Sequence, residues 1–174
     1  MATTTGPAVA GRAATMRLAE LYERHVGRAV ALARLLTGDP HLAEDVAHEA
    51  FIRVAGRFAH LRNADAFDAY LRRTVVNLCH ARFRRLRVER AWLRRQTVTD
   101  VGERPAFDPA DRDLVWGAIQ RLPFRQRGAV VLRYYEGLSV AETGAVLRCS
   151  TRAASSLLVR ALASLRQSLE GEER

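Results

Sequence analysis

The sequence has only two cysteines and no long hydrophobic run, and each shortage excludes a class of protein. No apolar stretch approaches the roughly 20 residues of a membrane-spanning helix, and the start "MATTTGPAVAGRAAT" lacks the charged and apolar parts of a secretory signal. We therefore expect a protein that stays in the cytoplasm. Cys79 and Cys149 have neither a Cys-x-x-Cys partner nor a His at a zinc-binding spacing, so both are predicted to be reduced packing residues.

Catalytic motifs are also missing, because the chain has no Gly-rich phosphate loop, no Ser/His/Asp arrangement and no HExxH. The best remaining candidate is a metal site made by Glu44, Asp45 and Glu49 with His41 and His48. Carboxylates at i, i+1 and i+5 do not converge on one ion as i, i+4 ligands can. The sequence thus indicates no enzyme, metal or cofactor. Whether this acidic face is merely solvated or docks a basic partner stays open.

The charge is strongly positive, with a formal net charge of +9 and a pI ≈ 11.0, which favours a polyanionic partner. All 28 basic side chains are Arg, which can contact phosphate or guanine through two hydrogen bonds at once. Residues 67–96 carry nine Arg against two acids, and residues 114–169 carry eight Arg against two acids. Residues 97–113 carry two Arg against five acids. Two basic lobes therefore flank an acidic connector.

The periodicity of the apolar residues is helical throughout, and no strand-like alternation of useful length occurs. We predict an all-α chain of two small helical domains joined by a flexible linker. The expected order is a disordered N-terminus (1–15), a first domain (16–96), a linker (97–110) and a second domain (111–170). Helices are expected from near Met16 to Leu36, from Asp39 or Pro40 to Gly56, from about Ala66 to Arg95, over Asp111–Arg121 and over Phe124–Glu136.

The stretch "GLSVAETGAVLRCSTRAASSLLVRAL", residues 137–162, predicts a helix-turn-helix. Gly137 suits the end of the preceding helix, Ser139 with Glu142 forms a capping box, and Ser150 or Thr151 caps the second helix. A buried stripe is expected along that second helix at Ala154, Leu158, Ala161, Leu165 and Leu169. The remaining faces leave Arg152, Ser155, Ser156 and Arg160 available for contact with DNA.

The stretch "AYLRRTVVNLCHARFRR", residues 69–85, combines Arg with aromatic residues. Guanidinium groups neutralise phosphates and aromatic rings stack on unpaired bases, so this mixture suits nucleic acid. We assign Phe67 and Phe83 to the core. Tyr70, next to a polar loop, is the best candidate for stacking on a base.

Three motifs in order, "HLAEDVAHEAFIRV", "AYLRRTVVNLCHARFRR" and "LPFRQRGAVVLRYYEGLSVAETGAVLRCS…LLVRALASLR", resemble a bacterial extracytoplasmic-function sigma factor. The resemblance implies that the first domain (sigma region 2) docks on core RNA polymerase and reads and opens the minus-ten element. The second domain (sigma region 4) holds the minus-thirty-five element. It implies polymerase-binding residues Glu44, Asp45, His48 and Glu49; minus-ten residues Asn63, Tyr70, Arg72, Arg73, Asn77, Arg82, Arg84 and Arg85; and minus-thirty-five residues Arg148, Thr151, Arg152, Ser155, Ser156 and Arg160.

Some positions depart from the pattern of this family. Ser155 and Leu157 replace a Lys and an Arg of the recognition helix, His48 replaces a frequent Gln, and Ala81 stands where an Asp is common. We expect binding to core polymerase to be retained despite these changes, whereas the promoter sequence that this chain recognises cannot be inferred from its relatives. Two other readings remain, a free-standing dimeric helix-turn-helix regulator and a helical adaptor that does not bind DNA. The resemblance also leaves open whether an anti-sigma factor holds the chain inactive, as in many relatives.

Overall fold

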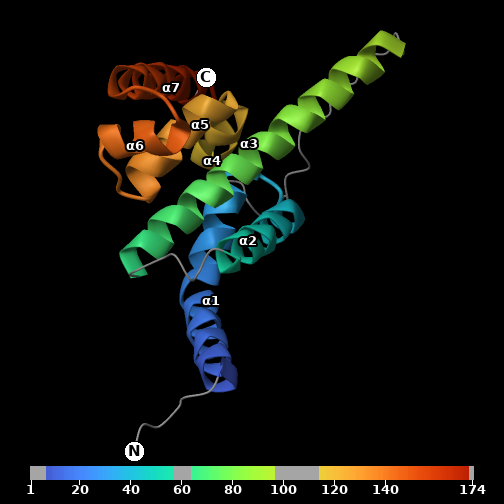
Figure 1. Cartoon of the computed structure of the whole chain (residues 1–174). Coiled ribbons are helices and arrows are strands. Elements are labelled where there is room, and N and C mark those ends of the chain that lie inside the picture. Colours follow the sequence, from blue (N-terminus) through green and yellow to red (C-terminus); the bar gives the residue numbers. More distant parts are fainter. Residues whose placement is uncertain (1–6, 57–63, 97–113, 173–174) are drawn as a thin grey trace, which may run out of the picture.

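The computed structural model of the protein describes residues 7–56, 64–96 and 114–172, and these residues form helices and short turns without any strand (Figure 1). The predicted all-α class is confirmed. The predicted linker, residues 97–110, lies outside the described residues. In chain order the elements are α1 (Pro7–Thr37), α2 (Pro40–Ala55), α3 (Ala64–Gln96), α4 (Leu114–Arg121), α5 (Phe124–Val130), the π-helical turn η2 (Val131–Tyr135), α6 (Val140–Leu147) and α7 (Thr151–Glu172).

Helices α1, α2 and α3 pack on one another and form the N-terminal lobe. The turn between α1 and α2 is fixed by Gly38, whose φ of +75° is in the left-handed region, and by Asp39, whose side chain accepts a hydrogen bond from the backbone N–H of Leu42 at 3.0 Å. Pro40 occupies the first helical turn, where its missing N–H costs nothing. The largest fully buried side chains of this lobe are Leu32, Leu36, Val46, Val54, Phe67, Val75 and Cys79.

Helix α1 begins at Pro7 and not near Met16. The prediction that residues 1–15 are disordered is therefore wrong for residues 7–15, while residues 1–6 lie outside the described part. The physical reason is that Pro suits the first turn of a helix and the following residues are rich in Ala, the best helix former. This stretch has no apolar stripe that would pack on other helices, so the periodicity did not predict a helix there, although the intrinsic helix propensity of its residues is high.

The C-terminal lobe consists of α4 to α7, with α7 packed against α4, α5 and α6. Its first described helix begins at Leu114. Residues 111–113, where the expected helix starts, lie outside the described residues. The single helix expected over Phe124–Glu136 is divided, because α5 continues as the π-turn η2. In this wider turn the backbone N–H of Glu136 donates to the carbonyl of Val131 at 3.0 Å. Such turns often occur at functional sites, and this one ends on the buried Glu136.

The helix-turn-helix starts and stops as the sequence predicts. Gly137 has a φ of +72°, and the capping box is complete, since Ser139 N–H donates to Glu142 Oε2 at 2.8 Å and Glu142 N–H donates to Ser139 Oγ at 3.2 Å. These hydrogen bonds hold the pKa of the Glu142 carboxyl below its usual range. Ser150 caps α7, because its Oγ accepts from the N–H of Ala153 at 3.2 Å.

The turn between α6 and α7 brings two backbones into close contact at Gly144. A Cβ atom at this position would lie 2.9 Å from the carbonyl oxygen of Cys149, which explains why the residue must be small. Arg148 ends α6 with a φ of +52°, a left-handed conformation that non-glycine residues seldom adopt. The expected stripe of α7 is confirmed at Ala154, Leu158 and Ala161, which are buried, whereas Leu165 and Leu169 are only half-buried.

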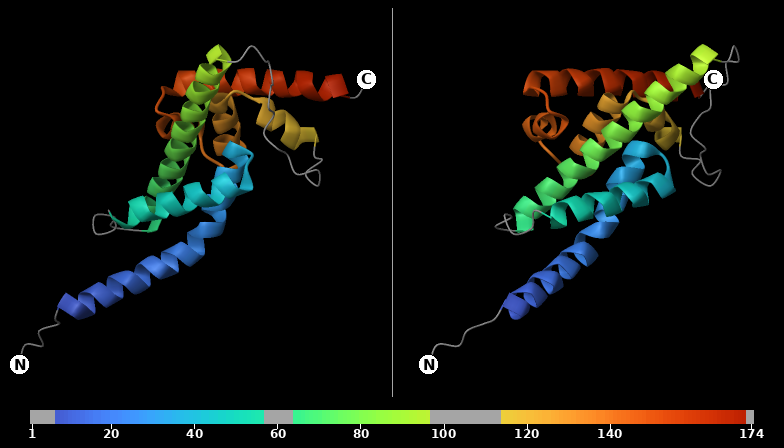
Figure 2. Two further views of the ribbon diagram at one scale, coloured as in Figure 1. Left: turned by 90° about the vertical axis from the view of Figure 1, so that its right-hand side faces the viewer. Right: turned by 45° about the vertical axis from the view of Figure 1, so that its right-hand side comes forward.

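The two lobes pack against each other, which the sequence did not predict. In both views of Figure 2 the α4–α7 group lies against α3 and the C-terminal half of α1, while the N-terminal half of α1 projects away. Phe124, Val131 and Leu132 of the C-terminal lobe belong to the same buried cluster as the core of α1–α3. The ring of Phe124 stacks on His80 of α3 with centroids 5.2 Å apart.

Candidate polymerase-binding and DNA-binding surfaces

The outer face of α2 carries three of the four residues expected to bind polymerase. Glu44, Asp45 and His48 are exposed, and none of them forms an ion pair with another described residue. Glu49 differs, since its carboxylate pairs with Arg53 at 2.6 Å and with Arg82 of α3 at 3.1 Å. Glu49 therefore ties α2 to α3, and the acidic face available to a partner is centred on Asp45.

One residue of this face was missed by the sequence analysis. Ile52 lies on α2 at i+7 from Asp45 and i+4 from His48, on the same side of the helix, and 61% of its surface is exposed. The buried residues of α2 are Ala43, Val46, Ala47, Ala50, Phe51 and Val54, so Ile52 lies off the core stripe. A large apolar residue outside the core stripe was the signal in the sequence. We refer to Glu44, Asp45, His48 and Ile52 as the α2 face.

A cavity of about 280 Å³ lies between α2 and α3 and is lined by Arg53, Tyr70, Thr74 and Asn77. Tyr70, Thr74 and Asn77 follow one another at i, i+4 and i+7 on one side of α3. The hydroxyl of Thr74 donates to the carbonyl of Tyr70 at 2.8 Å. The structure thus brings the expected residues Tyr70 and Asn77 together and adds Arg53 and Thr74, which the sequence did not single out.

The basic residues of α3 that were expected to contact DNA fall into two groups. Arg73, Arg82, Arg84 and Arg85 are exposed, with Arg82 paired to Glu49 and Arg85 to Glu89. Arg72 is different, because only 12% of its side chain is exposed and its guanidinium pairs with Asp68 and with Glu136 of the other lobe. It is separated from Tyr70 by about 200° around the helix, so it does not line the cavity. Asn63 lies outside the described residues.

The start of α7 presents the residues expected to face the minus-thirty-five element. Thr151, Arg152, Ser155 and Ser156 are all exposed, and so is Arg148 in the preceding turn. The Ser156 hydroxyl donates to the backbone carbonyl of Arg152 at 3.0 Å. The Arg152 guanidinium itself forms no hydrogen bond or ion pair with another described residue. The exposed N-terminus of α7 can therefore offer one long donor among small polar side chains.

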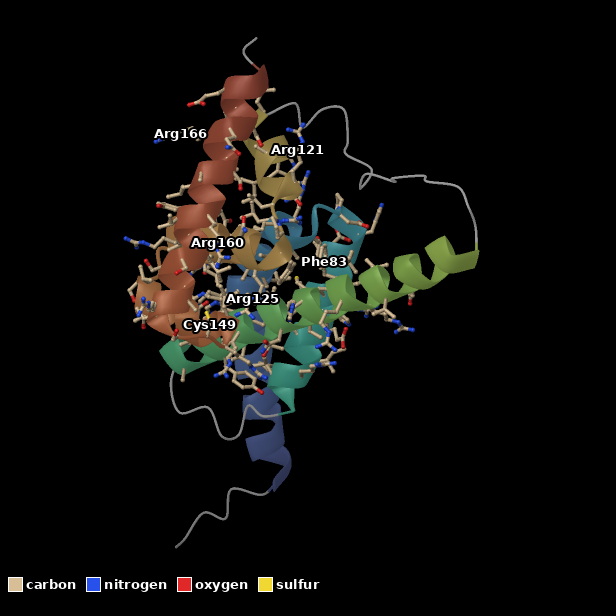
Figure 3. The ribbon with its side chains drawn as sticks, turned by 90° about the horizontal axis from the view of Figure 1, so that it is seen from above. Phe83, Arg121, Arg125, Cys149, Arg160 and Arg166 are labelled. Atoms are coloured by element: carbon tan, nitrogen blue, oxygen red, sulfur yellow. The ribbon has the colours of Figure 1, made fainter. Side chains whose placement is uncertain are left out.

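Further basic residues extend this surface along the lobe. Figure 3 shows Arg160 and Arg166 along α7, with Arg125 from the neighbouring α5. Arg160 donates from Nε to the carbonyl of Ser156 at 3.1 Å, so its position relative to the helix is fixed. Arg125 donates to the carbonyl of Leu147 at 3.2 Å, at the end of α6. These exposed guanidinium groups suit phosphates, which carry no sequence information.

Neither the two cysteines nor the candidate metal cluster forms a metal site within the described residues. Both cysteines are free, and burial raises the pKa of the Cys79 thiol to about 12. Within residues 7–56, 64–96 and 114–172 no group of three or more His, Cys, Asp or Glu side chains is placed to hold a metal ion. No helix in the described part of the chain is long and apolar enough to cross a membrane.

Comparison with known families gives two matches in the order of the two lobes. The family model described as Sigma-70 region 2 matches residues 21–89, and that described as Sigma-70, region 4 matches residues 118–167. The first match spans most of the N-terminal lobe and includes the α2 face and the cavity. The second includes the helix-turn-helix.

Individual relatives agree with the family matches. The chain is 36% identical over 141 residues to the RNA polymerase sigma-E factor of Streptomyces avermitilis, covering 81% of this chain and 78% of that one. It is 31% identical over 146 residues to the ECF RNA polymerase sigma factor SigM of Mycobacterium tuberculosis, covering 84% and 74% of the two chains. The sigma factor RpoE of Bartonella quintana, solved in complex with the anti-sigma factor NepR, shares the fold, with a TM-score of 0.67 at 20% identity over 86% of this chain and 94% of that one.

Proposed function

This chain belongs to the sigma-70 family, and we propose that three of its surfaces carry out separate steps of transcription initiation. The chain is an alternative sigma factor that directs transcription initiation by RNA polymerase, and it acts on promoter DNA. A match to region 2 ahead of region 4 excludes the reading as a free-standing dimeric regulator, which would need only the helix-turn-helix. The proposals below assign residues to the steps of initiation.

The α2 face is proposed to dock on core polymerase. Its exposed Asp45 and Glu44 are acidic on a chain of net charge +9, and the exposed Ile52 supplies an apolar anchor on the same side of α2. Interfaces commonly combine a central apolar residue with a charged rim that steers association. The partner surface that fits this face is basic with an apolar recess.

The cavity beside Tyr70 is proposed to take an unpaired base of the minus-ten element. It offers an aromatic ring for stacking, the Asn77 amide for hydrogen bonds to a base edge, and the Arg53 guanidinium, which also pairs with Glu49, for a phosphate. A volume of about 280 Å³ is ample for a nucleobase together with part of its sugar. Capture of a base in this position favours the opened strand over the duplex.

We expect Tyr70→Ala to weaken transcription from duplex promoters far more than from templates already mismatched around the start site. The lost stack, worth about 1–3 kcal/mol, penalises strand opening, which a mismatched template has already undergone. Tyr70→Phe keeps the ring and is the matched control, expected to behave like the wild type. The measurement is run-off transcription on the two templates in parallel. Equal defects of Tyr70→Ala on both would assign the ring to the core alone.

The N-terminus of α7 is proposed to read the minus-thirty-five element in the major groove. Arg152 is its long donor and can take guanine O6 and N7 together, whereas Ser155 and Ser156 can bond to more than one base. Arg160, two turns further along, is proposed to hold phosphate. One side chain then specifies a base pair while its small neighbours permit close approach.

Arg152→Ala is expected to cost about 1–3 kcal/mol at one preferred base pair and to relax selectivity there. Arg160→Ala should instead weaken all sequences alike and lower the salt slope of binding by about one. Binding of both variants to a library randomised over the minus-thirty-five element, at two salt concentrations, separates the two roles. Unchanged base preference in Arg152→Ala would mean that α7 reads shape and backbone only.

The observation that carries the function is the presence of both sigma regions in one chain with 36% identity to sigma-E factors. The test is transcription from fragmented genomic DNA by core polymerase with and without the purified chain. We expect new, reproducible start sites that require the chain, with shared sequence elements upstream. Transcript profiles identical to those of core polymerase alone would refute the assignment. We further propose that the chain acts in the cytoplasm as a non-enzymatic subunit and is held inactive by an anti-sigma factor.

A further inference from the structure

A buried carboxylate joins the two lobes. The side chain of Glu136, at the end of η2, is only 1% exposed, and its Oε2 accepts from Arg28 Nη2 of α1 at 2.9 Å and from Arg72 Nε of α3 at 2.6 Å. Asp68 of α3 contacts both arginines from the other side, at 3.7 Å from Arg28 Nη1. His25 completes the group with its Nδ1 3.4 Å from Asp68. Removing Glu136 would leave two guanidinium groups sharing one acid.

A second polar contact lies at the C-terminal end of α1. Arg127 of α5 donates from Nη1 to the carbonyl of Leu36 at 2.7 Å, and the side chain of Gln120 donates to the carbonyl of Leu35 at 2.8 Å. Carbonyl groups in the last turn of a helix have no partner within that helix. The C-terminal lobe thus provides donors for the end of α1, in addition to the apolar contact of Phe124 with His80 and Phe83.

These contacts hold the two DNA-reading surfaces close together. Helix α3 rises about 1.5 Å per residue, so Phe83 lies within about 10 Å of Asn77 along the helix axis. The C-terminal lobe contacts α3 at His80 and Phe83, and α7 packs directly on α5. Helix α7 is about 33 Å long by the same rise. The start of α7 is therefore a few tens of Å from the cavity beside Tyr70.

Promoter elements are separated by more than this distance. Elements centred near minus ten and minus thirty-five are about 25 base pairs apart, which is about 85 Å of B-form DNA at 3.4 Å per base pair. The chain cannot engage both elements while its lobes stay in contact. The α2 face lies outside the contact, since neither Asp45 nor Ile52 is covered by the C-terminal lobe.

We propose that Glu136 is a latch that keeps the free protein closed, and that engagement of both promoter elements requires this carboxylate to leave Arg28 and Arg72. The closed state is autoinhibitory for binding to two elements at once, and it leaves the α2 face accessible to polymerase. The consequence for promoters rests on the function proposed above, whereas the latch itself does not. Opening also exposes Arg72, which is withheld from any other anion while it pairs with Glu136.

The latch can be tested on the full chain by fluorescence energy transfer between dyes on Ala81→Cys of α3 and Ala163→Cys of α7, two exposed positions. Cys149 is replaced by Ser, while the buried Cys79 stays unlabelled. Wild type is expected to show high transfer. Glu136→Gln should raise the opening constant by about 100-fold or more, because it removes one charge from a buried ion pair, and should lower transfer. Glu170→Gln, an exposed change in the same lobe, is the matched control and should leave transfer unchanged.

Arg28→Gln gives an independent variant that is less demanding for folding, because 48% of the Arg28 side chain is exposed. It should also lower transfer, and combining it with Glu136→Gln should add less than the sum of the two single effects. Circular dichroism confirms that each variant is folded. High transfer in both folded single variants would overturn the latch. If Glu136→Gln fails to fold, the result for Arg28→Gln decides.

Promoter binding separates this proposal from the general function. Glu136→Gln should bind DNA that carries both elements more tightly than wild type does, relative to DNA that carries one element. If the sigma function were wrong, neither protein would select promoter DNA, yet the change in energy transfer would remain. If the latch were wrong, wild type would select promoters and the variant would show unchanged transfer and unchanged relative affinity.

Discussion

Arg127→Ala is expected to lower the free energy of unfolding by about 3 kcal/mol or more. The guanidinium of Arg127 is buried and donates to four oxygens: the carbonyls of Leu36, Gln120 and Leu122 and the side-chain oxygen of Gln120, at 2.6–3.2 Å. Removing it leaves buried carbonyls without a donor, and each such group costs about 1–3 kcal/mol. Burial lowers the pKa of Arg127 to about 10, so the side chain is still charged at pH 7.

The matched control for Arg127 is Arg125→Ala on the same helix. Arg125 is exposed and donates one hydrogen bond to Leu147 at 3.2 Å, so its loss should change the free energy of unfolding by no more than about 0.5 kcal/mol. Arg127→Lys should recover only part of the loss, because an ammonium cannot reach acceptors spread around a planar fork. Urea unfolding of the three variants measures the difference. Equal stabilities of Arg127→Ala and Arg125→Ala would contradict a stabilising role for this buried network.

Local features of the fold were predictable because their signals are contained in a few neighbouring residues. The capping box of Ser139 and Glu142, the glycine at 137 and the buried stripe of α7 each depend on residues within four positions of one another. The start of α1 was missed, because the Ala-rich residues 7–15 are helical by propensity without an apolar stripe. The π-turn η2 was missed too, since its five residues have no distinctive composition.

The contact between the lobes could not be read from the sequence, because its partners are far apart in the chain. Glu136 is 108 residues from Arg28 and 64 from Arg72, and nothing near any of them marks the pair. Counting charges placed Arg72 and Arg127 in the two basic lobes, and Arg72 was expected to contact the minus-ten element. Both side chains instead satisfy buried acceptors of the protein itself.

For the candidate site residues too, exposure was predictable from sequence, whereas contacts with other helices were not. Exposure of Asp45, Arg152 and Ser155 followed from helix periodicity and agrees with the structure. Glu49 followed the same pattern, yet its carboxylate is tied to Arg53 and Arg82 by distances that only the packing of α2 on α3 creates. The residues that match a family motif can therefore be found from sequence, whereas whether each one is available to a partner depends on tertiary contacts.

Asp45→Arg is expected to weaken binding to core polymerase by about 100-fold, which corresponds to about 3 kcal/mol. Asp45 is the suitable position for charge reversal, because it is exposed and has no ion pair among the described residues. Reversing Glu49 would break its contacts to Arg53 and Arg82 and would confuse a loss of binding with a loss of structure. Glu170→Arg makes the same charge change on α7 and should leave the affinity for core polymerase unchanged.

Ile52→Ser separates the apolar part of the α2 face from its charges. Removing a side chain that buries on docking should weaken binding about tenfold, with the same salt dependence as wild type, since no charge is altered. Asp45→Arg should change both the affinity and its salt dependence, because charges at the rim of an interface govern steering and screening. Both variants are measured by titration of labelled protein with core polymerase at two ionic strengths, after circular dichroism has shown native helix content. If Ile52→Ser binds as wild type does while Asp45→Arg fails, the face docks through charge alone; if neither variant loses affinity, polymerase binds elsewhere on the chain.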